Sequence, residues 1–134
     1  MDTLMRPRIF ITQPVADSAV KRLREVATVK INPDASRVPS KRELVAAVQQ
    51  CDILFSRLHD RIDRDVLAAN PKLRALNSMT ISPDNIDVAA ATELGIPVTV
   101  IPPIVTEATA DLTIGLMLAV ARRMLEGDRL ARKG

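Results

Sequence analysis

The chain has 134 residues, of which 47% are hydrophobic and 26% are charged, and its net charge is +3. These values describe one ordinary globular domain that is large enough to form a core. Aromatic residues make up only 1% of the chain, so the core must be aliphatic. Neither the stacking platforms nor the basic stripe of nucleic-acid-binding proteins is present.

The N-terminal sequence MDTLMRPRIFIT has no long apolar segment and no small-residue cleavage site, so we predict no signal peptide. No apolar run approaches the roughly 20 residues of a membrane span. Cys51 is the only cysteine, which excludes an internal disulfide framework and fits a reducing compartment. We expect a cytoplasmic protein that binds neither membranes nor nucleic acid, and we predict no metal site.

Short apolar runs alternate with segments of helical periodicity along most of the chain. Apolar runs rich in β-branched residues predict strands, whereas residues 15–26 place their apolar side chains on one face of a helix. Ser40 and Glu43 form a capping box, and Asp63 caps a further helix. The predicted strands are residues 8–12, 28–31, 52–56, 73–76 and 96–100, and the predicted helices are residues 15–26, 40–50, 63–70 and 84–94.

Strands that alternate with helices indicate a parallel sheet covered on both faces. We predict an α/β fold with a flavodoxin-like five-stranded parallel sheet of order 2-1-3-4-5. In such sheets ligands bind beyond the carboxyl ends of the strands. The polar loop from Ser78 to Pro83 follows the fourth strand, so it is the first predicted site of chemistry.

A long helix begins at Thr106, which is its expected N-cap, after the prolines Pro102 and Pro103. Its middle, from Leu112 to Ala121, is apolar almost all round. This pattern is typical of a helix that is buried on every side, and one small domain cannot easily bury all of it.

The motif DNID, a short Ala-rich helix, LGIPV, a proline hinge and VTEATADLTIGLMLAVARR follow one another between Leu73 and Arg123. In this order they resemble the D-isomer-specific 2-hydroxyacid dehydrogenases, and the last segment is nearest to their glyoxylate/hydroxypyruvate reductase branch. The resemblance implies an NAD(P)-dependent oxidoreductase acting on the CH–OH group of small D-2-hydroxy acids, with 2-oxo acid reduction as the reaction. It also implies a flavodoxin-like substrate domain joined to a Rossmann domain that binds NAD or NADP.

The resemblance assigns residues 1–101 to the substrate-binding domain and residues 102–134 to a hinge and the first helix of the cofactor domain. The four glycines of the chain cannot form the G-x-G-x-x-G fingerprint of that domain, so we expect the isolated chain to be inactive. In the family this helix packs against a second subunit, which predicts a homodimer formed through the helix from Thr106 to Arg129. A cofactor could approach Thr106, although capping is its favoured role.

In the family a Val/Ile-Gly pair holds the substrate carboxylate through backbone N–H groups, and Ile81 and Ser82 occupy that place. Ser82 stands where the family has Gly, and Pro83 supplies no N–H group. Proline also pushes Ser82 toward extended geometry. The amides of Ile81 and Ser82 remain as donors near a helix that we expect to begin at Asp84.

The loop after the third strand supplies the other predicted contacts. Arg57 is expected to attract the carboxylate, since its guanidinium matches a planar carboxylate, and Leu58 is expected to cover the apolar side of the substrate. His59 is the only histidine. We interpret it as a solvated loop residue, because the resemblance puts the catalytic His, Glu and Arg in the domain that this chain lacks. No catalytic residue is therefore predicted in this chain.

The two aspartates at the start of the fourth predicted helix are interpreted as structural residues. Asp84 and Asp87 have the spacing of a helix N-cap and a first-turn anion.

The alternative function is a non-enzymatic flavodoxin-like module for ligand binding or dimerisation. A phospho-receiver would need acidic residues where Thr12 and Ser56 stand, and a flavodoxin would need glycine in its phosphate loop, so both named modules are weakened while an unnamed one stays open.

Overall fold

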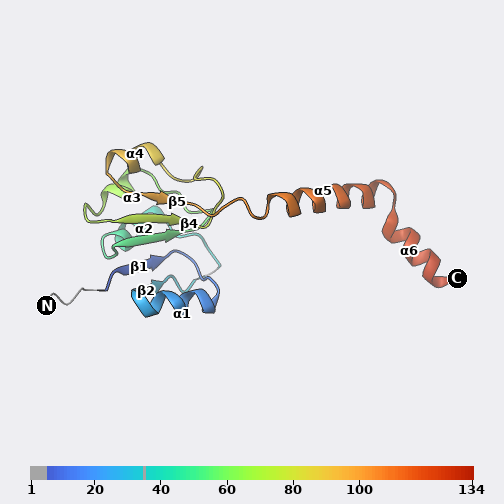
Figure 1. The fold of residues 1–134 in the computed structure, drawn as a ribbon, viewed down its shortest axis with the longest axis horizontal. Helices are drawn as coiled ribbons and strands as arrows, with labels where there is room; N and C mark the ends of the chain where they lie inside the picture. The colour runs from blue at the N-terminus through green and yellow to red at the C-terminus, as the bar shows by residue number, and fades with distance from the viewer. Residues whose placement is uncertain (1–5, 35) are drawn as a thin grey trace. The chain divides into compact units, whose positions relative to one another are not determined.

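The computed structural model describes residues 6–34 and 36–134. The segment that we expect not to be a signal peptide therefore lies partly outside the described residues. Within them the elements follow one another as shown in Figure 1. They are β1 (Arg8–Ile11), α1 (Asp17–Val26), β2 (Thr28–Ile31), α2 (Lys41–Val48), β3 (Ile53–Ser56), α3 (Arg64–Ala68), β4 (Ala75–Ser78), α4 (Val88–Glu93), β5 (Val98–Thr99), α5 (Thr106–Ala121) and α6 (Met124–Lys133).

The five strands form one sheet in the order β2-β1-β3-β4-β5, and every neighbouring pair is parallel. This confirms the predicted flavodoxin-like sheet. Because all strands run the same way, their carboxyl ends meet at one edge, which the arrowheads of Figure 1 mark. The register pairs Ile11 with both Ile31 and Phe55, and Ser56 with Ser78. The loops that follow neighbouring strands therefore begin at nearly the same level.

Each face of the sheet carries its own apolar cluster. On one face α2, α3 and α4 pack against Leu54 and Leu76, which are fully buried. On the other face Ile9, Ile11 and Ala27 form a smaller cluster with side chains of α1. Burying one such leucine contributes about 1.5–3 kcal/mol. The core is aliphatic, as predicted, with Phe10 and Phe55 packed at its margins.

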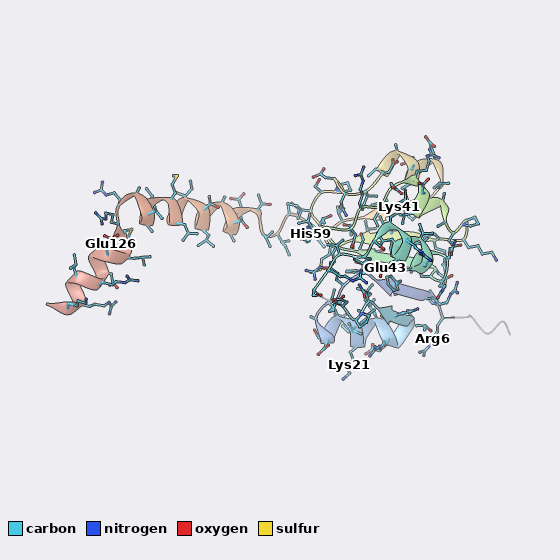
Figure 2. All side chains as sticks on the ribbon, turned by 180° about the vertical axis from the view of Figure 1, so that it is seen from behind. Arg6, Lys21, Lys41, Glu43, His59 and Glu126 are labelled. Carbon is cyan, nitrogen blue, oxygen red and sulfur yellow. The ribbon has the colours of Figure 1, made fainter. Side chains whose placement is uncertain are left out.

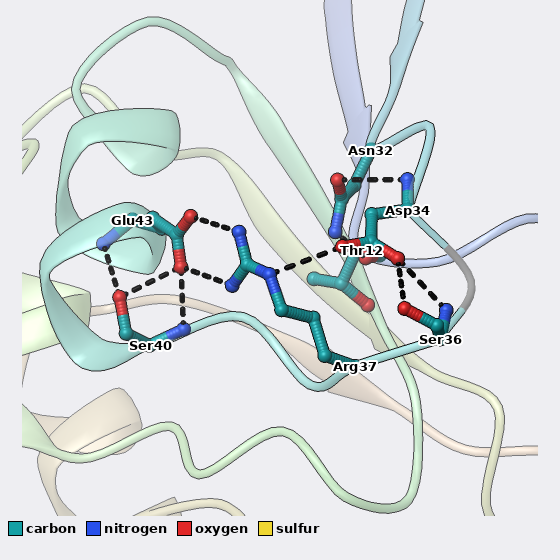
Figure 3. A network of polar contacts seen from close by, with 7 residues as sticks. All are labelled: Thr12, Asn32, Asp34, Ser36, Arg37, Ser40 and Glu43. Carbon is teal, nitrogen blue, oxygen red and sulfur yellow. Dashed lines mark hydrogen bonds and ion pairs between the residues drawn. The ribbon is translucent and has the colours of Figure 1, made fainter.

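The start of α2 is fixed by a polar network drawn in Figure 3. Ser40 and Glu43 form the predicted capping box, with the Ser40 amide donating to Oε2 of Glu43 at 2.8 Å. Arg37 donates to both carboxylate oxygens of Glu43, at 2.8 and 2.6 Å, and pairs with Asp34. The network continues from Asp34 through Asn32 and reaches the end of β1.

The predicted start of the fourth helix at Asp84 is wrong. Asp87 is the N-cap of α4, and it accepts from the amide of Ala90 at 2.9 Å. The physical reason is that Asp84 and Asn85 form a turn, in which the amide of Ile86 donates to the carbonyl of Pro83 at 2.9 Å. Ile86 then forms a parallel bridge with Ile62, so the helix begins only at Val88. The predicted bounds of the fourth strand are also early, because Leu73 still belongs to a turn in which its amide donates to the carbonyl of Asn70.

Residues 102–134 form a compact unit of their own. The helix predicted as continuous to Arg129 is wrong, because it breaks at Arg123, whose φ of 50° is left-handed. Val105, not Thr106, is the N-cap of α5. The side chains of α5 and α6 are not buried in the single chain, so the predicted burial of residues 112–121 against a second copy stays a prediction. Among the described residues, no helix has the length and apolar character to cross a bilayer.

The capping network predicts a pH dependence of stability. Hydrogen bonds from Arg37 and then Ser40 hold the pKa of Glu43 far below its ordinary value of 4.5. A carboxyl whose pKa is depressed on folding stabilises the fold above its unfolded pKa and loses that contribution as the pH falls. The urea midpoint of the chain is therefore expected to fall between pH 7 and pH 3, and to fall less in Glu43→Gln.

The matched control is Glu25→Gln, which removes a carboxylate of α1 that makes no ion pair within the described part of the chain. This variant should keep the full acid dependence. An equal acid dependence in wild type and Glu43→Gln would contradict the role of the network.

Candidate functional site

The loop after β4 presents backbone donors at the carboxyl edge of the sheet. The amide of Met79 donates to the carbonyl of Ser56 at 3.0 Å, and the carbonyl of Thr80 accepts from Ile101 at 2.9 Å. The amides of Thr80, Ile81 and Ser82, which follow Met79 in the chain, donate to no group among the described residues. Thr80 is buried, whereas Ile81 and Ser82 have exposed surface. Since a backbone N–H needs a partner, the amides of Ile81 and Ser82 are the donors available to water or to an anion.

Side chains fix the path of this loop. Ser78 and Thr80 are buried, and their hydroxyl oxygens lie 2.8 Å apart in a hydrogen bond. Ile81 is 48% exposed, so its side chain does not pack into the core at this point of the loop. The expected support from a helix at Asp84 is absent, because the six-residue α4 begins only at Val88. The amides of Ile81 and Ser82, which we call the candidate cradle, therefore act without a helix terminus beside them.

The loop after β3 is held by a buried carboxylate that the sequence analysis did not identify. Asp60 is 0% exposed, and its Oδ2 accepts from the amide of Arg57 at 2.6 Å and from Oγ1 of Thr12. Its Oδ1 has no partner within the described part of the chain. A buried acceptor left unpaired costs about 1–3 kcal/mol, so this aspartate is not explained by packing alone.

Asn85 joins this loop to the loop after β4. Its Nδ2 donates to the carbonyl of Asp60 at 2.7 Å and to the carbonyl of Arg57 at 3.1 Å. The structure thus brings the predicted Arg57–Leu58 segment beside the segment that follows Ser82. The sequence signal for these residues was that the polar pairs His59-Asp60 and Asp84-Asn85 follow strands β3 and β4. Such pairs are equally typical of turns.

The residues directly after β3 differ in how far they are exposed. Arg57 is half-buried and donates from Nη1 to the carbonyl of Pro14 at 3.2 Å, so part of its guanidinium binds the loop after β1. Leu58 is 61% exposed. His59 is also exposed, and Figure 2 shows it at the opposite end of the first unit from Arg6, which precedes β1.

A polar cavity of about 490 Å³ lies beside these loops. Its walls come from the segments that lead into α3 and α4, and Arg57, Leu58, Ile81 and Ser82 are not among its lining residues. The lining residues are His59, Arg61, Ile62, Asp63, Asp84, Asn85, Ile86 and Asp87.

Cys51 and Thr106 have structural surroundings. Cys51 is buried in the main apolar cluster, and burial raises the pKa of its thiol to about 11, which suppresses the reactive thiolate. This agrees with its interpretation as a core residue. Thr106 is the first residue of α5, and its amide donates to the carbonyl of Pro103 at 3.4 Å.

Comparison with known proteins identifies the family. The family model described as the D-isomer specific 2-hydroxyacid dehydrogenase catalytic domain matches residues 9–126. The chain belongs to this family. The resemblance found in the sequence is therefore confirmed. The loops described above belong to a 2-hydroxyacid dehydrogenase catalytic domain.

Relatives of this dehydrogenase domain are considerably longer. The glyoxylate reductase of Korarchaeum cryptofilum is 40% identical over 130 residues, which are 97% of this chain and 39% of that protein. A solved structure of a protein from Thermus thermophilus has a TM-score of 0.79 and 38% identity, covering 95% of this chain and 40% of the other. The chain thus spans about two fifths of the length of the relatives that it matches.

A third relative is the NADPH-dependent glyoxylate/hydroxypyruvate reductase of Sinorhizobium meliloti, whose structure is solved in complex with NADP and malonate. Its TM-score is 0.67 at 26% identity, and the match covers 96% of this chain and 39% of that one.

The geometry of the cradle predicts a pattern of amide hydrogen exchange. The amides of Ile81 and Ser82 have no acceptor among the described residues, whereas that of Met79 is bonded to Ser56. In exchange measured by NMR at neutral pH, Ile81 and Ser82 should exchange much faster than Met79, because an unbonded amide needs no opening step. Equal protection of the three amides would mean that the cradle is closed.

Proposed function

We propose that this chain is the substrate-binding part of an NAD(P)-dependent oxidoreductase that acts on small D-2-hydroxy acids and their 2-oxo acid counterparts. The proposal is carried by one observation, the open amides of Ile81 and Ser82 at the carboxyl edge of β4. Glyoxylate and hydroxypyruvate are the favoured substrates, because the relatives are reductases of these two acids.

The carboxylate is the group that this chain is suited to hold. Two adjacent backbone donors can each form a charge-assisted hydrogen bond to a carboxylate, and such bonds are about twice as strong as neutral ones. The guanidinium of Arg57 has five donors, of which one is bound to Pro14. The others would attract the anion toward the rim, and the exposed Leu58 would cover the apolar side of the substrate.

The nicotinamide cofactor does not fit the residues of this chain alone. The glycines stand at positions 95, 115, 127 and 134 and cannot form a dinucleotide cradle. NAD or NADP would therefore be bound mainly by a further domain, with Thr106 at its edge, and we derive no step of hydride transfer through the residues described here. The domain assignment follows: residues 1–101 bind substrate, and residues 102–134 lead into the cofactor domain.

A titration with glyoxylate tests the cradle. Adding glyoxylate to the isotope-labelled chain should shift the amide resonances of Ile81 and Ser82, whereas its neutral amide, glyoxylamide, should not. Ser82→Pro removes one donor and should weaken binding about tenfold or more, since a hydrogen bond to a charged group is worth about 1.5–3 kcal/mol.

Ser82→Ala is the matched control, because it keeps the backbone N–H group. It should bind glyoxylate within about twofold of wild type. Absence of any shift at Ile81 and Ser82 in the wild type would overturn the proposed function and would favour a non-enzymatic module.

We also propose a homodimer formed through the helical segment from Thr106 to Arg129. Leu112, Leu116 and Val120 are 63%, 58% and 78% exposed in the single chain. Apolar side chains exposed together on one helix mark a contact surface. Burying each of them against a second copy would contribute about 1.5–3 kcal/mol.

Sedimentation equilibrium tests this association. The wild-type chain should sediment as a dimer, and Leu116→Glu should shift it to monomer, because the contact would bury an unpaired charge. Val26→Glu changes an equally exposed apolar residue of α1, at 66% exposure, and should leave the dimer intact. A monomeric wild type, or a Leu116→Glu variant that still dimerises, would contradict the proposal.

A further inference from the structure

A series of side-chain hydrogen bonds runs along the carboxyl edge of the sheet. Asn32, after β2, donates from Nδ2 to the carbonyl of Thr12 at 3.1 Å. Thr12, after β1, donates from Oγ1 to Asp60 in the loop after β3. Asn85, after β4, donates to the carbonyls of Asp60 and Arg57. The bonded loops follow one another in the order of the strands, β2-β1-β3-β4.

Asp60 is the centre of this series. It accepts with one oxygen from Thr12 and from the amide of Arg57, while its second oxygen is buried without a partner among the described residues. Burying a carboxylate is costly, and apolar replacements of buried charged groups are often as stable or more so. The benefit of an aspartate at this position is therefore the geometry that it imposes on the loops it joins.

We propose that Asp60, whose carboxylate is oriented by Thr12, is a positioning residue that fixes the Arg57–His59 loop, which Asn85 bonds to the segment that follows the open amides. The proposal rests on the proposed function, because it assigns Asp60 an effect on carboxylate binding at those amides. If the loop leaves this arrangement for part of the time, the apparent affinity for a carboxylate falls by the fraction of chains that keep it.

The sign of the effect separates positioning from electrostatics. A negative charge near a carboxylate site repels the ligand, so Asp60→Asn should tighten binding if charge alone mattered. The amide oxygen of asparagine is a weaker acceptor than a carboxylate oxygen. If Asp60 acts by positioning, Asp60→Asn loosens the loop and weakens binding despite the lost charge.

The experiment compares glyoxylate affinity across four variants of the 134-residue chain, measured from the amide shifts of Ile81 and Ser82. Thr12→Val removes the hydroxyl at nearly constant volume, and Asp60→Asn removes the charge. Both should bind glyoxylate on the order of tenfold more weakly than wild type. Thr12→Ser keeps the hydroxyl, and Asp84→Asn removes an exposed charge outside the series, so both should stay within about twofold of wild type.

Amide exchange at Arg57 provides a second readout that does not depend on glyoxylate. Loss of the bond to Asp60 should make this amide exchange on the order of tenfold faster in Asp60→Asn, with the thermal midpoint of each variant showing that it is folded. Affinity equal to wild type in both test variants, or tighter binding by Asp60→Asn, overturns the proposal. If the wild type binds no glyoxylate, the proposed function fails together with the effect on affinity, and the exchange of Arg57 alone then shows whether Asp60 holds the loop.

Discussion

The hydrogen bond between Thr12 and Asp60 is the contact on which the arrangement of the loops at the carboxyl edge of the sheet depends. It joins the loop after β1 to the loop after β3, and both residues are fully buried. From Thr12 the polar contacts continue in the other direction through Asn32 to Asp34, Arg37 and the capping box of α2, as Figure 3 shows. One continuous polar network therefore reaches from the start of α2 to the loop after β4. A parallel sheet gathers the loops at one edge, and this network gives them a defined geometry there.

Much of the fold was predictable because its signals are local. Strand and helix periodicity follow from the apolar pattern, and the capping residues Ser40, Glu43 and Asp63 bond to backbone groups only three residues away. Such signals are present in any short window of sequence. The parallel order of the sheet then follows from the alternation of strands and helices.

The errors fall where distant contacts override local preference. The helix predicted from Asp84 starts at Val88 because Ile86 pairs with Ile62 in the preceding loop. The break at Arg123 places a non-glycine residue at φ 50°, a conformation that few side chains favour and that the apolar pattern of the helix does not reveal. At the site, the topology of the sheet pointed to the loop from Ser78 to Pro83, and the family resemblance pointed to Ile81 and Ser82 within it. Asp60 was missed because its partner Thr12 is 48 positions away in the sequence.

The proposed function assigns the binding of the substrate carboxylate to backbone amides of this chain. Backbone amides hold an anion without titrating, so they suit a task that must not compete with the proton and hydride transfers of the reaction. In the proposed function, Arg57 and Leu58 would add charge and apolar cover from a neighbouring loop. The most direct test is a crystal structure of the chain with glyoxylate. We expect carboxylate oxygens within about 2.7–3.2 Å of the nitrogens of Ile81 and Ser82. Glyoxylate bound instead in the cavity beside His59 and Asn85, with both amides free, would contradict the account.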